Sequence, residues 1–157
     1  MALQLMTGTF QSTLDDKGRV VIPAPLRDRY HGELVITQGR EFCVWIMTGK
    51  TFEKFLETLE NTASSLDNEE YMAFQYQHVA PAQIAEIDQK SGRIPVPSAI
   101  RSYARLSKDC LILSINGHLE IWNAEAYRSY MQEMQLKAKE AMRKLGPVHF
   151  FPKEGAE

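Results

Sequence analysis

The sequence has few of the residues and patterns that mark several large protein classes. It contains only two cysteines in 157 residues, Cys43 and Cys110, and their spacing is not that of a metal-binding or redox pair. We therefore expect two buried, reduced thiols rather than a disulfide framework. No hydrophobic run approaches about 20 residues, so the sequence predicts no membrane span. The N-terminus lacks the charged start and apolar core of a secretory signal.

The chain also lacks an excess of positive charge. Its 18 Lys and Arg residues face 20 Asp and Glu residues, which gives a formal net charge of −2. The overall charge of the protein therefore does not indicate nucleic-acid binding. If it binds DNA, its basic residues must be concentrated in one region, and oligomerisation is one way to concentrate them.

Motifs of the common enzyme classes are missing as well. The sequence has no phosphate-binding loop, no dinucleotide fingerprint and no G-x-S-x-G nucleophile turn. Its four histidines, none of which has a partner at metal-binding spacing, are His31, His78, His118 and His149. His118 and Glu120 share one face of an expected strand, but a hydrogen-bonded polar pair explains them. We expect no enzyme activity, no metal and no cofactor.

What the sequence does contain is an internal repeat. Residues 14–27 read LDDKGRVVIPAPLR and residues 87–101 read IDQKSGRIPVPSAIR. Three pairs lie at one offset of 74 residues: Arg19 and Arg93, Pro23 and Pro97, and Arg27 and Arg101. A duplicated unit need not close a core alone, so the two halves are expected to fold together.

Local patterns predict the same elements in each half. In the first half we expect a strand that ends at Asp15, a turn over 15–18, a strand over 19–22, a short helix over 24–30, strands over 34–37 and 42–47, and a helix capped by Thr48. In the second half we expect a strand over 84–87, a turn over 88–92, a strand over 93–96, a short helix after Pro97, strands over 111–115 and 119–122, and a longer closing helix. A loop over 61–68 and a helix over 69–79 connect the halves. The predicted class is α+β, mainly β.

With both copies in view, the chain resembles the MraZ family of bacterial transcriptional regulators over about residues 6–130. The residues that carry the resemblance are Gly8-Thr9-Phe10, Leu14 to Arg19, Ile22-Pro23-Ala24, Arg27, Ile87-Asp88, Gly92-Arg93, Pro97, Arg101, Tyr103-Ala104, Leu106 and Glu120-Ile121-Trp122-Asn123. The resemblance implies two AbrB-like swapped-hairpin halves, at 6–62 and 81–130. A C-terminal helix extension and tail would follow at 131–157.

The resemblance also implies a function. It suggests a sequence-specific DNA-binding repressor, cytoplasmic and nucleoid-associated, that forms a homo-oligomeric ring of eight or more subunits. Its partner would be double-stranded DNA, at promoter direct repeats ahead of the division and cell-wall gene cluster. Two alternatives remain open: a ring scaffold that does not bind DNA, and an AbrB-type, antitoxin-like DNA-binding protein. The duplication and the Glu-Ile-Trp box speak against the antitoxin.

The DNA-contacting motif of that family is D-x-x-x-R. It places candidate DNA-binding residues at Asp15, Lys17 and Arg19 in the first half and at Asp88, Lys90 and Arg93 in the second. The second copy contains one additional residue between its Asp and its Arg, so Lys90 does not map directly onto Lys17. The resemblance therefore leaves open whether the second loop contacts DNA as the first does.

The chemistry of these residue types allows two interpretations. Arg offers a planar fork of donors that suits a guanine edge or a phosphate, Lys offers a mobile charge for phosphate, and Asp15 can hold Arg19 in position. Alternatively, Asp15 and Arg19 form only a surface ion pair across a tight turn, worth roughly 0–1 kcal/mol. Repetition of the charged set favours the first interpretation.

Other prominent residues are interpreted as structural. Trp45 and Trp122 each lie in an apolar strand just before a helix, which favours core or subunit-interface anchors over base-stacking platforms. Arg27 and Arg101 lie at the ends of the short helices, where they can cap carbonyl groups or pair with acids. We do not assign these two arginines to DNA.

Overall fold

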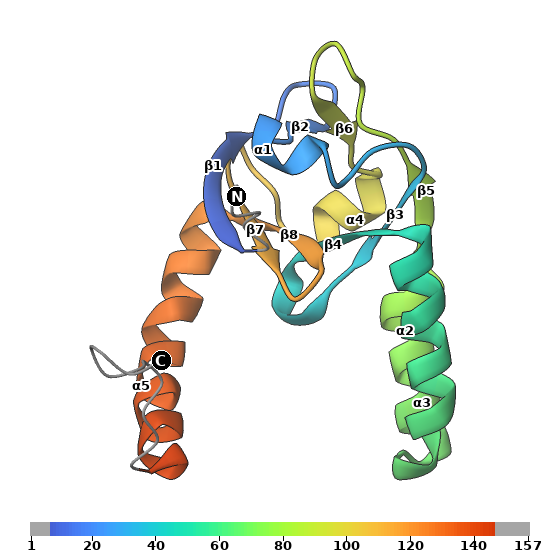
Figure 1. Ribbon diagram of the computed structural model, residues 1–157, viewed down its shortest axis with the longest axis vertical. Helices are drawn as coiled ribbons and strands as arrows, with labels where there is room; N and C mark the ends of the chain where they lie inside the picture. The colour runs from blue at the N-terminus through green and yellow to red at the C-terminus, as the bar shows by residue number, and fades with distance from the viewer. Residues whose placement is uncertain (1–6, 147–157) are drawn as a thin grey trace, which may run out of the picture. The chain divides into compact units, whose positions relative to one another are not determined.

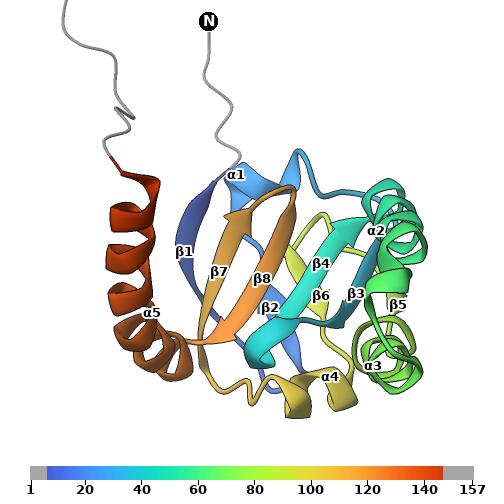
Figure 2. The ribbon, with the colours of Figure 1, turned by 90° about the horizontal axis from the view of Figure 1, so that it is seen from below.

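A six-stranded antiparallel sheet forms the centre of the computed structural model, which describes residues 7–146 (Figure 1, Figure 2). The strand order is β1-β7-β8-β4-β3-β5. The strand bounds are Gly8–Thr13 for β1, Leu34–Gln38 for β3, Val44–Thr48 for β4, Gln83–Ala85 for β5, Asp109–Ile115 for β7 and His118–Asn123 for β8. A separate two-stranded ribbon pairs β2, Arg19–Val21, with β6, Arg93–Pro95.

The two halves exchange strands. β1 of the first half pairs with β7 of the second, and β5 of the second half pairs with β3 of the first. At the centre of the sheet β4 and β8 pair with Trp45 opposite Glu120, and in the ribbon Val20 lies opposite Ile94. Each of these two pairs joins residues at equivalent places in the repeat. The two halves are therefore related by an approximate two-fold axis that passes near both pairs. The predicted mainly β fold of two interlocked halves is confirmed.

Burial follows the alternation of the strands. Val20 in β2 and Ile94 in β6 are fully buried, whereas their neighbours along each strand are partly or largely exposed. The core draws on both halves, and its largest fully buried side chains are Tyr30, Ile22, Leu34, Ile36, Ile46, Ile94, Ile100, Ile112, Leu119, Ile121, Val20 and Val44. Neither half could bury these side chains alone, because its strands pair with those of the other half.

Short helices follow the ribbon strands in both halves. Each begins after a proline whose missing N–H is not needed at a helix start. The helix α1 spans Ala24–Arg27 after Pro23, and α4 spans Ser98–Tyr103 after Pro97. Sequence patterns predicted α1 through residue 30, but the regular helix ends three residues earlier.

A pair of helices, α2 and α3, connects the halves. In α2, Gly49–Thr62, the Thr48 hydroxyl accepts a hydrogen bond from the N–H of Thr51, which confirms the predicted cap. A capping box between Asp67 and Glu70 starts α3, Asn68–Phe74, which continues as a π-helical turn over Gln75–Val79. The rings of Phe55 and Phe74 stack between the two helices at 5.9 Å.

Other predicted elements also differ from the structure in their bounds or their pairing. The expected loop over 61–68 is shorter, because α2 runs to Thr62 and Ala63–Ser65 forms a 3₁₀ turn. The strand expected over 84–87 is β5, Gln83–Ala85. The turn at 15–18 is present, but its flanking strands share only the bridge between Leu14 and Val20, since each pairs mainly with the other half.

The chain divides into two compact units, Met1–Ala124 and Glu125–Glu157. The second unit contains most of the long helix α5, Ala124–Leu145, which confirms the longer closing helix expected from the sequence. The predicted tail, with His149, Phe150 and Phe151, lies outside the described residues. Of the helices the structure describes, none has the length and apolar character needed to cross a membrane.

Candidate nucleic-acid interface

The β2–β6 ribbon brings the two motif arginines onto one face. Opposite residues in an antiparallel pair project to the same side, and Arg19 lies opposite Pro95 while Arg93 lies opposite Val21. The buried pair Val20 and Ile94 fills the other side. The two side chains are 36% and 38% exposed, so both are partly accessible from solvent.

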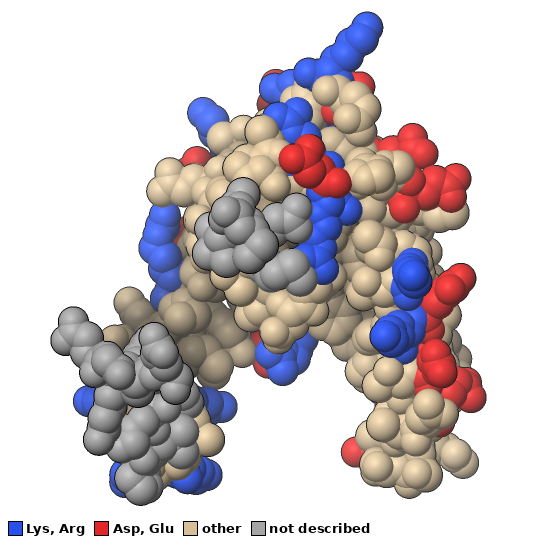
Figure 3. All heavy atoms as spheres, viewed as in Figure 1, with Lys and Arg blue, Asp and Glu red and all other residues tan. Residues whose placement is uncertain are grey.

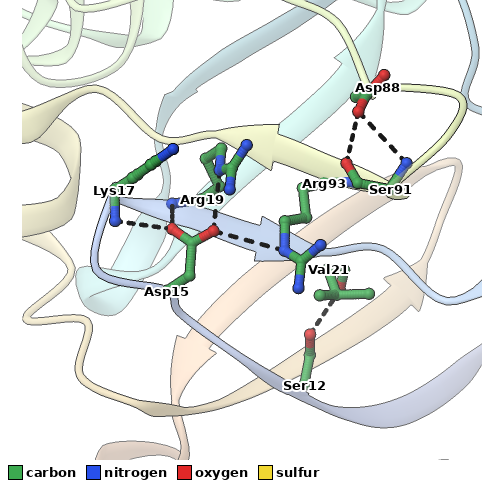
Figure 4. Close-up of polar contacts among 8 residues, drawn as sticks. All are labelled: Ser12, Asp15, Lys17, Arg19, Val21, Asp88, Ser91 and Arg93. Carbon is green, nitrogen blue, oxygen red and sulfur yellow. Dashed lines mark hydrogen bonds and ion pairs between the residues drawn. The ribbon is translucent and has the colours of Figure 1, made fainter.

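In the first loop, the Asp15 carboxylate organises both the backbone and Arg19 (Figure 4). One oxygen, Oδ1, accepts hydrogen bonds from the backbone N–H groups of Lys17 and Arg19, each at 2.9 Å. The other, Oδ2, accepts from Nε of Arg19 at 2.9 Å. The expected contact between Asp15 and Arg19 is therefore present.

The electrostatics of this loop favour the charged form of Asp15. The N–H of Arg19 is the largest cause that lowers the pKa of Asp15, and the Arg19 side chain and the N–H of Lys17 add to it. Partial burial of the carboxyl group acts in the opposite direction but does not prevail. Asp15 is thus an anion at neutral pH, with Arg19 held against it.

The second loop uses its carboxylate differently. Oδ2 of Asp88 accepts from the Ser91 hydroxyl at 2.7 Å and from the Ser91 N–H at 3.3 Å (Figure 4). Oδ1 of Asp88 accepts from the N–H of Lys90 at 3.4 Å. The Ser91 hydroxyl is the largest cause that lowers the pKa of Asp88, followed by the N–H groups of Lys90 and Ser91. Ser91 lies in the longer loop, and both its hydroxyl and its N–H donate to the Asp88 carboxylate.

Arg93 instead approaches the carboxylate of the first loop. Its Nε lies 3.4 Å from Oδ2 of Asp15, the same oxygen that accepts from Arg19. The contact is an ion pair without hydrogen-bond geometry, and Nε of Arg93 is buried with no hydrogen-bond partner among the described residues. One carboxylate therefore serves two arginines, and it holds Arg19 more closely than Arg93.

The two motif lysines are exposed at the tips of the loops. Both lysines lie in the turns and are exposed. Lys17 contacts Asp15, and Lys90 contacts Asp88, through the backbone N–H group. Figure 3 shows Lys and Arg atoms at the end of the molecule that carries the loops, with carboxylates among them. In this view, basic and acidic atoms lie side by side at the loops.

The Glu-Ile-Trp box lies elsewhere, at the centre of the large sheet. Glu120 accepts hydrogen bonds from the indole N–H of Trp45 at 3.2 Å and of Trp122 at 2.9 Å, and it contacts Nε2 of His118 at 2.9 Å. Burial acts to raise the pKa of Glu120, but the hydrogen bonds from His118, Trp122 and Trp45 outweigh it and lower the pKa. This network joins the two halves, which agrees with the structural role expected for the tryptophans.

The structure shows loop contacts of three residues that sequence reasoning did not predict. Ser91 contacts Asp88, and the guanidinium groups of Arg27 and Arg101 pack against Gly92 and Gly18. The matching offsets of Arg27 and Arg101 in the repeat were visible in the sequence, but their contacts cross between halves. Among residues 7–146, no group of His, Cys, Asp and Glu side chains has the arrangement of a metal site.

Comparison with known proteins identifies the family. A family model described as "MraZ protein, putative antitoxin-like" matches residues 5–75 and again residues 79–145. The chain belongs to the MraZ family. Its two matched segments correspond to the two interlocked halves of the sheet.

Curated members of the MraZ family match over most of their length. The transcriptional regulator MraZ of Treponema denticola is 36% identical over 146 residues, which cover 92% of this chain and 100% of the relative. The proteins of the same name from Frankia casuarinae and Thermobifida fusca are 34% and 33% identical, over 83% of this chain and 90% of each relative. The family is one of transcriptional regulators and not of enzymes.

Proposed function

We propose that this chain is a sequence-specific DNA-binding repressor, in which the two loops of the β2–β6 ribbon contact the DNA. Asp15, Lys17 and Arg19 form the first contact unit, and Asp88, Lys90 and Arg93 form the second. The observation that carries the proposal is the shared face of Arg19 and Arg93, with Arg19 held at Nε by Asp15. The names of the relatives support a role in transcription.

The geometry of Arg19 suits base recognition. Asp15 engages the guanidinium at Nε, which leaves the two Nη groups for a bidentate contact with O6 and N7 of guanine. An arginine that is already oriented loses less side-chain entropy on binding than a free one. The exposed Lys17 suits a phosphate contact, which fixes position but reads no sequence.

Assembly into a homo-oligomeric ring of eight or more subunits would multiply these contacts. The chain carries a net charge of −2, so a single copy attracts DNA weakly as a whole. A ring that places one pair of loops per subunit along promoter direct repeats gains avidity from individually weak contacts. The proposed targets are promoter repeats ahead of the division and cell-wall gene cluster, and the proposed location is the cytoplasm, on the nucleoid.

A mobility-shift titration with DNA from upstream of this protein's own gene tests the proposal. Intact direct repeats should shift at lower protein concentration than repeats with scrambled bases. Affinity should fall steeply with salt, because each neutralised phosphate releases counterions. Weak, sequence-independent binding at physiological salt would instead favour the ring scaffold. Sedimentation at micromolar concentration tests the ring separately, and a monomer alone would contradict it.

A further inference from the structure

Gly18, the residue before Arg19, lies against an arginine from the other half. Its φ of +77° is left-handed, and the residue is buried. A Cβ atom built on Gly18 would overlap the Arg101 guanidinium, at 2.6 Å from Cζ. Glycine is needed here for two reasons, its backbone angle and the space that Arg101 occupies.

Arg101 is itself fixed by the strand that pairs with this loop. It lies in the last turn of α4, and its Nη1 donates a hydrogen bond of 2.6 Å to the carbonyl of Val96. The N–H of Val96 in turn donates to the carbonyl of Gly18 at 2.9 Å. Arg101, Val96 and Gly18 therefore form a closed set of contacts across the two halves.

The second loop has the reciprocal arrangement. Gly92 has a φ of +69° and is buried, and a Cβ atom there would lie 2.6 Å from Nη1 of Arg27. The carbonyl of Gly92 accepts a hydrogen bond from the N–H of Ile22 at 2.7 Å. Arg27 lies in α1 of the first half. Each half thus supplies the arginine that packs against the glycine in the other half's loop.

The packing distinguishes these arginines from Arg19 and Arg93. Both are half-buried, and each lies against the backbone of a loop instead of projecting from its tip. Within the described part of the chain, neither is ion-paired with a carboxylate. A guanidinium is a rigid planar group, whereas a lysine ammonium is a compact point charge on a flexible stem, so lysine would not reproduce this packing.

We propose that Arg27 and Arg101 are positioning residues, each of which holds the other half's loop in the conformation that presents Arg93 or Arg19. The inference rests on the proposed function only for its effect on DNA. The crossed contact is a property of the free protein. It links each half to the loop of the other half, because Arg101 lies against Gly18 and Arg27 lies against Gly92.

Hydrogen exchange of the full-length protein tests the crossed contact without DNA. In Arg101→Ala, the amides of Lys17, Gly18 and Arg19 should exchange about five-fold faster, while those of Lys90 to Gly92 keep their rates. In Arg27→Ala the pattern should reverse. Arg40→Ala removes an exposed arginine outside the loops and should change neither set. The proposal would be overturned if Arg101→Ala and Arg27→Ala each accelerated amide exchange equally in both loops, or in neither loop.

Conservative and double variants separate position from charge. Arg101→Lys keeps the charge but loses the planar group, so it should weaken operator binding about as much as Arg101→Ala, by roughly ten-fold. Wild-type affinity for Arg101→Lys would assign a simple charge role and refute positioning. Gly18→Ala should weaken binding less in the Arg101→Ala background than alone, because the overlap is gone, and equal penalties would also refute it.

These measurements fail independently of the proposed function. If wild-type protein binds no operator but the exchange pattern is crossed, the DNA-binding proposal fails and the positioning of each loop by the other half's arginine stands. If operator binding is normal but exchange is not crossed, the positioning proposal fails alone.

Discussion

The two loops of the ribbon have the same pattern of backbone hydrogen bonds, but their aspartate carboxylates make different contacts. In both, the Asp N–H donates to the Arg carbonyl at 2.8 Å, and the Gly N–H donates back to the Asp carbonyl at 3.0 Å in the first loop and 2.7 Å in the second. Only Asp15, however, is hydrogen-bonded to the arginine side chain of its own loop, while Asp88 turns to Ser91. One inserted residue is enough to redirect a carboxylate while the turn closes in the same way.

This difference implies unequal ordering of the two arginines. Arg19 is held by a hydrogen bond at 2.9 Å, whereas Nε of Arg93 has an ion pair at 3.4 Å and no hydrogen-bond partner among the described residues. An arginine held less closely loses more side-chain entropy when it binds, at about 0.5–1.5 kcal/mol for a flexible side chain. We therefore expect the first loop to dominate binding.

Arg19→Ala should have the largest effect on operator affinity. Loss of one bidentate base contact is worth about 1–3 kcal/mol, and the loss recurs in every subunit of the proposed ring. We expect affinity at fixed salt to fall about 100-fold or more. The melting temperature should change little, because the Arg19 side chain is 36% exposed and an exposed ion pair such as that with Asp15 contributes roughly 0–1 kcal/mol.

The matched control for Arg19→Ala is Lys54→Ala, which removes one exposed positive charge from α2, away from the ribbon. It should leave specific binding near wild type. Near wild-type affinity for Arg19→Ala itself would remove the basis for assigning the first loop to DNA.

Arg93→Ala should weaken binding less, by about ten-fold at the same salt concentration. The reason is the weaker hold on its guanidinium described above. Competition titrations with both alanine variants on one operator fragment compare the loops directly. A larger defect for Arg93→Ala than for Arg19→Ala would reverse the ranking.

Sequence reasoning predicted the strands and the repeat but not how the loops use their charges. Alternation, turn residues and the proline positions are local signals, and they located nearly every element. That the flanking strands pair across halves follows from the family resemblance and not from local pattern. The inserted residue was visible as a spacing of five instead of four, yet its consequence depends on where the Ser91 hydroxyl points.

The contacts of Arg27 and Arg101 illustrate a second limit. Both arginines were recognised as equivalent in the repeat, but the sequence gives no distance between Arg101 and Gly18 or between Arg27 and Gly92. These contacts arise only once the strands are exchanged. Helix-end arginines are ordinarily expected to contact their own helix carbonyls, so local reasoning pointed to the wrong partners.

Deletion of Ser91 should make the two loops alike. The second loop would then read Asp-Gln-Lys-Gly-Arg beside the Asp-Asp-Lys-Gly-Arg of the first, with Asp88 released to hold Arg93. We expect operator affinity to rise about two- to ten-fold, which corresponds to the ordering cost of one side chain. In this background Arg93→Ala should become more damaging than it is in the wild type.

The control for the deletion is Ser91→Ala, which removes the hydroxyl but keeps the loop length. It should release Asp88 without bringing it into register with Arg93, so affinity should change little. If the deletion and Ser91→Ala behave alike, loop length is not the cause of the difference between the loops.

The smallest expected effect is on stability at acid pH. The pKa of Asp15 is lowered in the folded protein, chiefly by the N–H of Arg19, from an ordinary value of 3.8. A lowered folded-state pKa contributes stability that is fully present above the unfolded-state pKa and is lost as the pH falls through the folded-state value. Asp15→Asn should therefore melt below the wild type at neutral pH, and the two melting curves should converge below about pH 4. Asp88→Asn should behave in the same way, because its pKa is also lowered, chiefly by the Ser91 hydroxyl; it removes a charge interaction with Arg19 but leaves the hydrogen bond between Asp15 and Arg19 in place. Operator binding at neutral pH then separates the two carboxylates: Asp15→Asn should weaken it and Asp88→Asn should leave it nearly unchanged. Equal binding defects would mean that the shared contact of Asp15 with both arginines has no consequence for DNA.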